Sequence, residues 1–124
     1  MSPTIKPGEK VTVDYLAYAR ATPSRWDVIV FHPPSYPDDY WAMRVVGLPG
    51  ENIVIRDDGL LIDGKAVSPP VHVQAIHYVP LATTNTTVPT NSYFVLGDNS
   101  TNANDSRYIG TIPVANILGK VKEK

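Results

Sequence analysis

Short runs of valine, isoleucine, leucine and tyrosine alternate with glycine, proline and aspartate along the whole chain. None of these runs keeps the 3.6-residue periodicity of a long amphipathic helix, and β-branched and aromatic residues favour strands. The pattern therefore predicts an all-β fold. The expected strands are residues 10–18, 27–31, 41–46, 52–56, 60–62, 71–79, 93–96 and 117–121.

Glycine and proline predict how these strands are connected. Gly59 and the Asp63-Gly64 pair tolerate the positive φ of tight hairpin turns, so residues 52–67 are expected to form a small meander. The segment 32–39 carries three prolines, which cannot donate to a ladder, and is expected to be a loop. Residues 80–91 are polar and β-branched, and they fit either a loop or a frayed edge strand.

Composition narrows the classes of protein. The 124 residues fit one domain, in which antiparallel sheets coil around one core. With 11 basic and 12 acidic residues the net charge is −1, which argues against nucleic acid as a partner. The chain has no cysteine and no apolar run of the roughly 20 residues that a membrane helix needs, so the domain as written is expected to be soluble.

Three segments combine a strand-like run with a turn-rich cluster. The most specific is "SYFVLGDNSTNANDSRYIGTIP", residues 92–113, in which a strand ends in Gly-Asp-Asn and a polar loop leads to Asp-Ser-Arg and a later Gly-x-x-Pro. The second is "MRVVGLPGEN", residues 43–52, and the third is "MSPTIKPGE" at residues 1–9. Taken singly, a turn after a strand explains the glycines and prolines of each segment.

In this order and spacing the three segments resemble the motifs of the type I signal peptidases, over most of the chain. That family consists of membrane-bound serine endopeptidases with a Ser/Lys dyad, which cleave signal peptides after small residues and need no cofactor or metal. The resemblance implies an extended signal peptide as partner, lying along Met1, Ser2, Pro3 and Thr4. It also implies an anchoring membrane helix upstream of the nucleophile, absent from these residues, and a location on the extracytoplasmic (periplasmic or extracellular) side of the membrane.

Neither residue of the dyad is present in the sequence. The nucleophilic serine of the family would precede Met1, and Met43 stands where the family has its general-base lysine. A desolvated lysine can lose its proton and then accept that of the serine, whereas a thioether has no titratable proton. Lysine-dependent cleavage is therefore not expected.

Ala103 supports the interpretation that the dyad was lost. In the family a serine at this place orients the lysine, and a buried hydroxyl without a partner costs about 1–3 kcal/mol. A natural lineage that lost the dyad explains both Met43 and Ala103, whereas an engineered Lys→Met exchange explains Met43 alone.

The resemblance also implies a group of residues, called here the floor residues, that support the site structurally and do not react. An ion pair of Arg44 with Asp98 or Asp105 is expected beneath it. The full set of floor residues is Arg44, Asp98, Asn99, Asp105, Ser106 and Arg107. Ser106 is also typical of a turn or capping hydroxyl. Trp26, Trp41 and Tyr40 fit either a membrane-facing rim or the core.

The other reactive residue types indicate no second site. His72 and His77 are five residues apart on an expected strand and would point to opposite faces. Two functions therefore remain open. The chain is either a signal-peptidase domain whose dyad is incomplete, or a non-catalytic homologue that binds extended peptides or a protein partner by strand addition.

Overall fold

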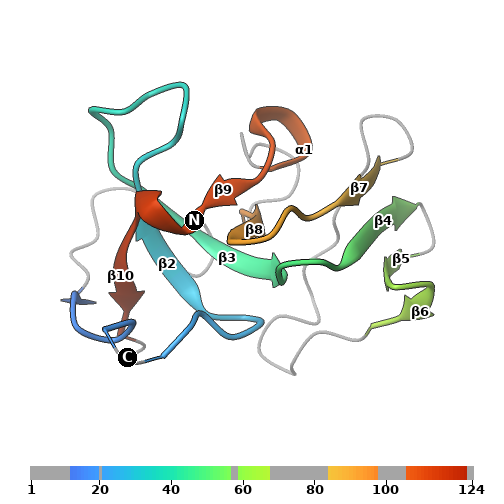
Figure 1. Ribbon diagram of the computed structural model, residues 1–124, viewed down its shortest axis with the longest axis horizontal. Helices are drawn as coiled ribbons and strands as arrows, with labels where there is room; N and C mark the ends of the chain where they lie inside the picture. The colour runs from blue at the N-terminus through green and yellow to red at the C-terminus, as the bar shows by residue number, and fades with distance from the viewer. Residues whose placement is uncertain (1–11, 20, 57–58, 68–83, 98–105, 123–124) are drawn as a thin grey trace.

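The computed structural model describes residues 12–19, 21–56, 59–67, 84–97 and 106–122. These residues form two antiparallel sheets, which confirms the all-β prediction (Figure 1). The strands are β1 Val13–Asp14, β2 Val28–Phe31, β3 Trp41–Gly47, β4 Asn52–Arg56, β5 Gly59–Ile62, β6 Lys65–Ala66, β7 Thr84–Thr87, β8 Ser92–Leu96, β9 Ile112–Pro113 and β10 Ile117–Val121. A short helix α1, Ser106–Ile109, and a 3-10 turn η2, Val114–Asn116, complete them.

The larger sheet has six strands in the order β1-β10-β2-β3-β8-β9. Its two middle strands, β2 and β3, pair over four residues, from Val28 opposite Arg44 to Phe31 opposite Trp41. All four residues of β2 are buried, as expected for a valine and isoleucine run at the centre of a sheet. β3 is followed by a short loop that leads to β4 of the second sheet (Figure 1).

The smaller sheet has four strands in the order β6-β5-β4-β7, and its first three confirm the expected meander. Asp63 and Gly64 have φ of 52° and 81°, so both adopt the left-handed conformation that a two-residue hairpin turn requires. The segment for which a loop and an edge strand remained open contains β7, which pairs with β4 at the edge of the sheet.

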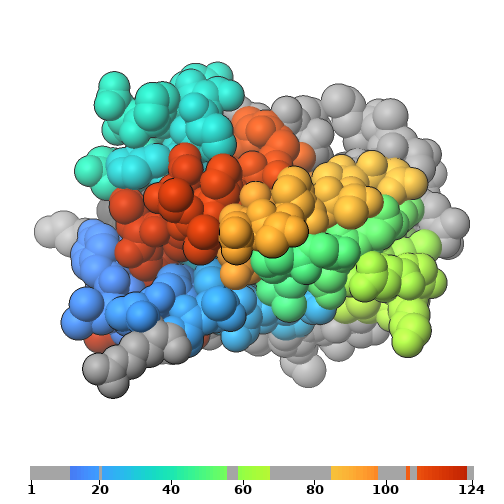
Figure 2. Space-filling model, in the orientation of Figure 1, coloured from blue at the N-terminus to red at the C-terminus, as the bar shows by residue number. Residues whose placement is uncertain are grey.

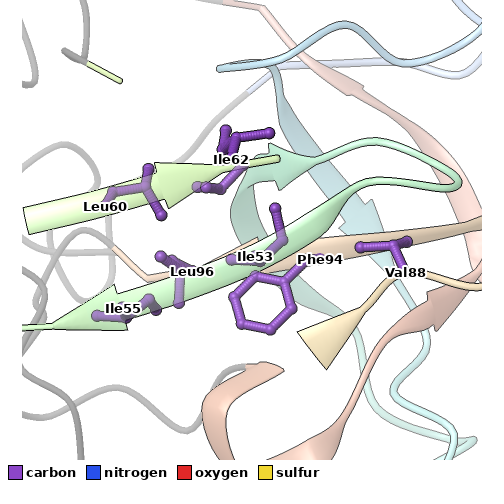
Figure 3. Close-up of a cluster of buried hydrophobic side chains, with 8 residues drawn as sticks. Ile53, Ile55, Leu60, Ile62, Val88, Phe94 and Leu96 are labelled. Atoms are coloured by element: carbon purple, nitrogen blue, oxygen red, sulfur yellow. The ribbon is translucent and has the colours of Figure 1, made fainter. Parts of the chain in front are cut away.

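Buried side chains from both sheets meet in one group, called here the intersheet cluster (Figure 3). It consists of Val46, Ile53, Ile55, Leu60, Ile62, Val88, Phe94 and Leu96. A second group, the Met43 cluster, consists of Ile29, Phe31, Met43, Val45, Tyr93, Val95 and Ile112. Because successive side chains of a strand alternate, β3 and β8 contribute one face to each cluster.

One strand prediction is wrong in its extent. Residues 10–18 were expected to form one strand, but β1 covers only Val13–Asp14 and a turn follows over residues 15–18. The cause is local, because Oδ1 of Asp14 accepts the amide of Leu16 at 3.0 Å and so closes an Asx turn. The expected strand at 71–79 lies outside the described residues.

Candidate active site

Met43 lies in the middle of β3, and its side chain is buried, with 9% of its surface exposed. It stands directly opposite Ile29 of β2 and packs within the Met43 cluster beside valine, isoleucine and aromatic side chains. The expected burial of this side chain is confirmed. Its surroundings are those of a core methionine.

The edge of β3 that faces away from β2 is only partly covered by the described residues. β8 pairs with β3 from Arg44 to Gly47, whereas β2 pairs along Trp41 to Arg44 on the other side. In the described part of the chain, the stretch from Trp41 to Met43 therefore has a ladder partner on one side. Val45 directs its N–H and C=O toward the segment before β2, where both are hydrogen-bonded. Because the backbone groups of successive residues alternate between the two edges of a strand, the N–H and C=O of Ala42 point away from β2.

Arg44 is completely buried. Its Nη1 donates to the backbone carbonyl of Trp26 at 2.8 Å. A buried guanidinium with a fixed backbone acceptor fits the expected structural role beneath the site. Its expected partners Asp98 and Asp105 lie outside the described residues, so the ion pair stays a prediction.

Ser106 is buried at the start of α1, and its Oγ accepts the backbone amide of Val95 at 2.9 Å. The hydroxyl thereby connects α1 to β8, the neighbour of β3. For Arg107 the structure describes the backbone, within α1. The remaining residues expected at the site lie outside the described residues: Met1, Ser2, Pro3, Thr4, Asp98, Asn99 and Ala103.

The turn at residues 24–27, called here the anchor turn, was not singled out from the sequence. The amide of Asp27 donates to the carbonyl of Ser24, which closes the turn, and Trp26 has a φ of 76°. The amide of Trp26 donates to the carbonyl of Val45, and the amide of Val45 donates to the carbonyl of Asp27, both at 2.7 Å. Two residues of the turn thus oppose one residue of β3, which is the arrangement of a β-bulge.

Arg25 connects the anchor turn to the second motif. Its guanidinium forms two hydrogen bonds with the carboxylate of Glu51, at 2.7 and 2.8 Å, and Nη1 also donates to the carbonyl of Val46 at 2.8 Å. Glu51 in turn accepts the amide of Leu48 at 2.7 Å. The hydrogen bonds from Arg25 lower the pKa of Glu51 below its ordinary value, and the same contact raises the pKa of Arg25.

Asp27 connects the anchor turn to two other parts of the chain. Its carboxylate accepts the hydroxyl of Tyr18 at 2.9 Å and lies 3.3 Å from the amine of Lys120 on β10. Burial, followed by the contact with Asp27, raises the pKa of Tyr18 far above its ordinary value. No local pattern predicts this grouping, because Lys120 lies far along the chain from Tyr18 and Asp27.

The loop between β2 and β3 carries exposed aromatic side chains and projects from the molecule (teal in Figure 2). Tyr40 is 69% exposed and lies against the ring of His32, whose Nδ1 donates to the carbonyl of Asp39. Of the residues that fitted either a rim or the core, Trp26 packs against the intersheet cluster and Trp41 against the Met43 cluster.

The described residues hold no candidate metal site and no helix that could span a membrane. No group of three histidine or acidic side chains in them is placed to hold a metal ion. None of their helices is long and apolar enough to cross a membrane.

An all-β fold of two antiparallel sheets, with residues 43–47 of the second motif buried on β3, points to the class of signal-peptidase-like domains. A model of the family "Signal peptidase, peptidase S26" matches residues 1–124, and the chain belongs to this family. It is 33% identical to signal peptidase I V of Bacillus subtilis (strain 168), a match that covers 99% of this chain and 79% of the relative. It is 35% identical to signal peptidase IB of Staphylococcus aureus, over 98% of this chain and 70% of the relative.

A solved structure supports the same assignment. The crystal structure of a signal peptidase I from Enterococcus faecalis V583 superposes with a TM-score of 0.70 at 31% sequence identity. The match covers 82% of this chain and 97% of that chain. The resemblance inferred from the three motifs is therefore confirmed at the level of family and fold.

Proposed function

We propose that this chain is a signal-peptidase-type domain that does not cleave peptides by the Ser/Lys route. The observation that supports this is the buried Met43, which occupies the position of the family's lysine according to the motif alignment. A thioether among apolar side chains cannot accept a proton from a hydroxyl. Loss of a base that activates a nucleophile costs several orders of magnitude in rate.

A second role is favoured by the edge of β3. The stretch from Trp41 to Met43 pairs with β2 on one side, and Ala42 directs its backbone groups to the other side. An extended peptide could add there as a further strand, with main-chain hydrogen bonds supplying affinity. We therefore propose that the domain retains binding of an extended peptide of the signal-peptide type, or of a protein partner, without hydrolysis.

The proposed location follows from the family. Signal peptides are processed where secreted chains emerge, so the domain is placed on the extracytoplasmic side of the membrane, with an N-terminal membrane anchor in the parent protein. Membership of the signal peptidase family supports this part of the proposal.

Strand addition can be tested with two peptides that differ only in backbone methylation. Both carry the same fluorescent label and the same Ala-x-Ala sequence, and one is N-methylated at its odd residues, the other at its even residues. In an added strand alternate N–H groups face the neighbouring strand. Fluorescence anisotropy should therefore show that one methylated peptide binds as the unmodified peptide does and that the other does not bind.

The complementary measurement uses the protein. Replacement of Ala42 by proline removes one N–H from the β3 edge that faces away from β2. It leaves the hydrogen bonds of Trp41 and Met43 to β2 in place. This variant should lose peptide binding while its circular dichroism spectrum is unchanged. Equal binding of both methylated peptides, or full binding by a folded Ala42→Pro variant, would contradict strand addition at β3.

A further inference from the structure

β3 contains a β-bulge three residues after Met43. Val45 stands opposite Val95 of β8 and Gly47 stands opposite Phe94, so Val46 is an extra residue in the ladder. Val45 packs in the Met43 cluster and Val46 in the intersheet cluster, so the bulge lies where β3 contributes to both clusters. The extra residue of a bulge is left unpaired by the neighbouring strand, and its backbone groups need another partner.

The anchor turn supplies that partner. Nη1 of Arg25 donates to the carbonyl of Val46 at 2.8 Å. The same guanidinium is held by both oxygens of Glu51, and the Arg25 and Glu51 side chains are only 25% and 17% exposed. A planar guanidinium can satisfy a carboxylate and a carbonyl at once, which a lysine amine does less well.

Two further contacts fix the residues between Met43 and the bulge. The side chain of Arg44 donates to the carbonyl of Trp26. The backbone of Val45 bonds to Trp26 and Asp27. Three consecutive residues of β3, directly after Met43, are therefore each held by the anchor turn.

The turn itself adopts a conformation that its sequence does not favour. Trp26 has a φ of 76°, in the left-handed region that suits glycine. Strained residues of this kind persist where the surrounding contacts over-determine them, and they cluster at functional sites. In this turn the surrounding contacts are the hydrogen bonds to β3.

We propose that Arg25 is a positioning residue, which holds the Val46 bulge and thereby sets the position of Met43 and of the β3 edge that faces away from β2. It acts through Val46 and Glu51 and touches no bound peptide. The part of this inference that concerns peptide binding rests on the proposed function, whereas the position of Met43 can be measured without any peptide.

The first test follows Met43 by NMR. The wild type has two methionines, Met1 and Met43, so ¹³C-labelled methionine methyl groups give two resonances, which the Met43→Leu variant assigns. A variant that introduces a methionine gives a third resonance, and Met43→Leu made in that variant again assigns Met43. Replacement of Arg25 by methionine should shift the Met43 methyl resonance. It should also speed amide exchange at Val46 and Gly47 by roughly tenfold, because a buried carbonyl loses its donor.

Lys120→Met provides the matched control. This change removes another ion pair of the same turn, that of Lys120 with Asp27, but none of the contacts to Val46. It should leave the Met43 resonance and the exchange at Val46 and Gly47 as in the wild type, even if the melting temperature falls. Arg25→Lys should lie between the wild type and Arg25→Met.

The outcomes separate positioning from general stability. If Arg25→Met does not fold, Glu51→Gln keeps the arginine and neutralises its partner, and it should shift the Met43 resonance in the same direction by a smaller amount. An unchanged Met43 resonance in folded Arg25 and Glu51 variants overturns the proposal, as does an equal shift in Lys120→Met. If the wild type binds no extended peptide, the proposed function fails, and the NMR result still decides the positioning role.

Discussion

At the scale of single residues, Trp26 is the position where sequence and backbone conformation disagree most. Its φ of 76° is expected of glycine, yet it carries a large side chain that packs against the intersheet cluster. The left-handed conformation costs a non-glycine residue about 1–2 kcal/mol. The contacts of its backbone with Arg44 and Val45 offset this cost.

Two substitutions at Trp26 separate the strain from the packing. Both Trp26→Ala and Trp26→Gly remove the indole, but only glycine adopts the left-handed conformation without penalty. Urea unfolding should therefore find Trp26→Gly more stable than Trp26→Ala by about 1 kcal/mol. In an ordinary strand the order is reversed, because glycine is the less stable of the two. Finding alanine more stable would show that the turn carries no strain.

Glu51 gives a prediction for acid stability. Arg25 lowers its pKa in the folded state, so above the ordinary glutamate pKa both states are ionised and the pairing contributes fully. As the pH falls below that value the unfolded state takes up its proton first, and the contribution is lost through the folded pKa.

The comparison is between the wild type and Glu51→Gln. The free energy of unfolding, measured by urea titration at a series of acidic pH values, should fall more steeply with decreasing pH in the wild type. Equal slopes for the wild type and Glu51→Gln would mean that Arg25 does not lower the pKa of Glu51 in the folded state.

At the scale of elements, Gly47 is the last residue of β3, before the loop that leads to the second sheet. A Cβ at this position would lie 2.8 Å from Cδ1 of Ile53 and 2.8 Å from Cβ of Phe94, two fully buried residues. Gly47→Ala should therefore destabilise the protein by about 1–3 kcal/mol through overpacking.

Gly64→Ala is the matched control for that change. Gly64 has a positive φ but no neighbour near its missing Cβ, so alanine there meets backbone strain alone. Thermal unfolding should place Gly47→Ala below Gly64→Ala in stability. The reverse order would mean that Ile53 and Phe94 can move enough to accept a Cβ at Gly47.

The elements also show what the sequence could predict. β2, β3, β4, β5, β8 and β10 match expected strands because each contains a run of aliphatic or aromatic residues. The two-residue strand β9 was not predicted, and β6 was expected only as part of the meander, since runs this short have no periodicity. The anchor turn was missed because its partners, Glu51, Tyr18 and Lys120, are brought together only by the fold.

At the scale of the whole molecule, the motifs were sufficient to predict family and fold, because they are spread over most of the chain in fixed order. The position of Met43 in the core could also be inferred, since it lies within an apolar run of β3. The ion pair of Arg44 and the neighbourhood of Ala103 stay predictions. The arrangement of a polar loop depends on side-chain contacts that local sequence does not determine.

A rebuilt dyad should restore activity if the rest of the site keeps the family's geometry. The variant carries a serine immediately before Met1, together with Met43→Lys and Ala103→Ser, because the members of such a set act as a unit. Cleavage of an Ala-x-Ala peptide should rise with pH toward an alkaline plateau as the new amine loses its proton. A folded variant without pH-dependent cleavage would instead favour a site that has lost its catalytic geometry.

The most direct measurement is cleavage by the unaltered protein. A fluorogenic peptide with an Ala-x-Ala site, held at a concentration where anisotropy shows it bound, should give no more product than buffer over the same time. The thioether of Met43 cannot accept a proton, so the bound peptide is expected to stay intact. Cleavage that survives repurification and disappears when one serine of this chain is replaced by alanine would contradict the account.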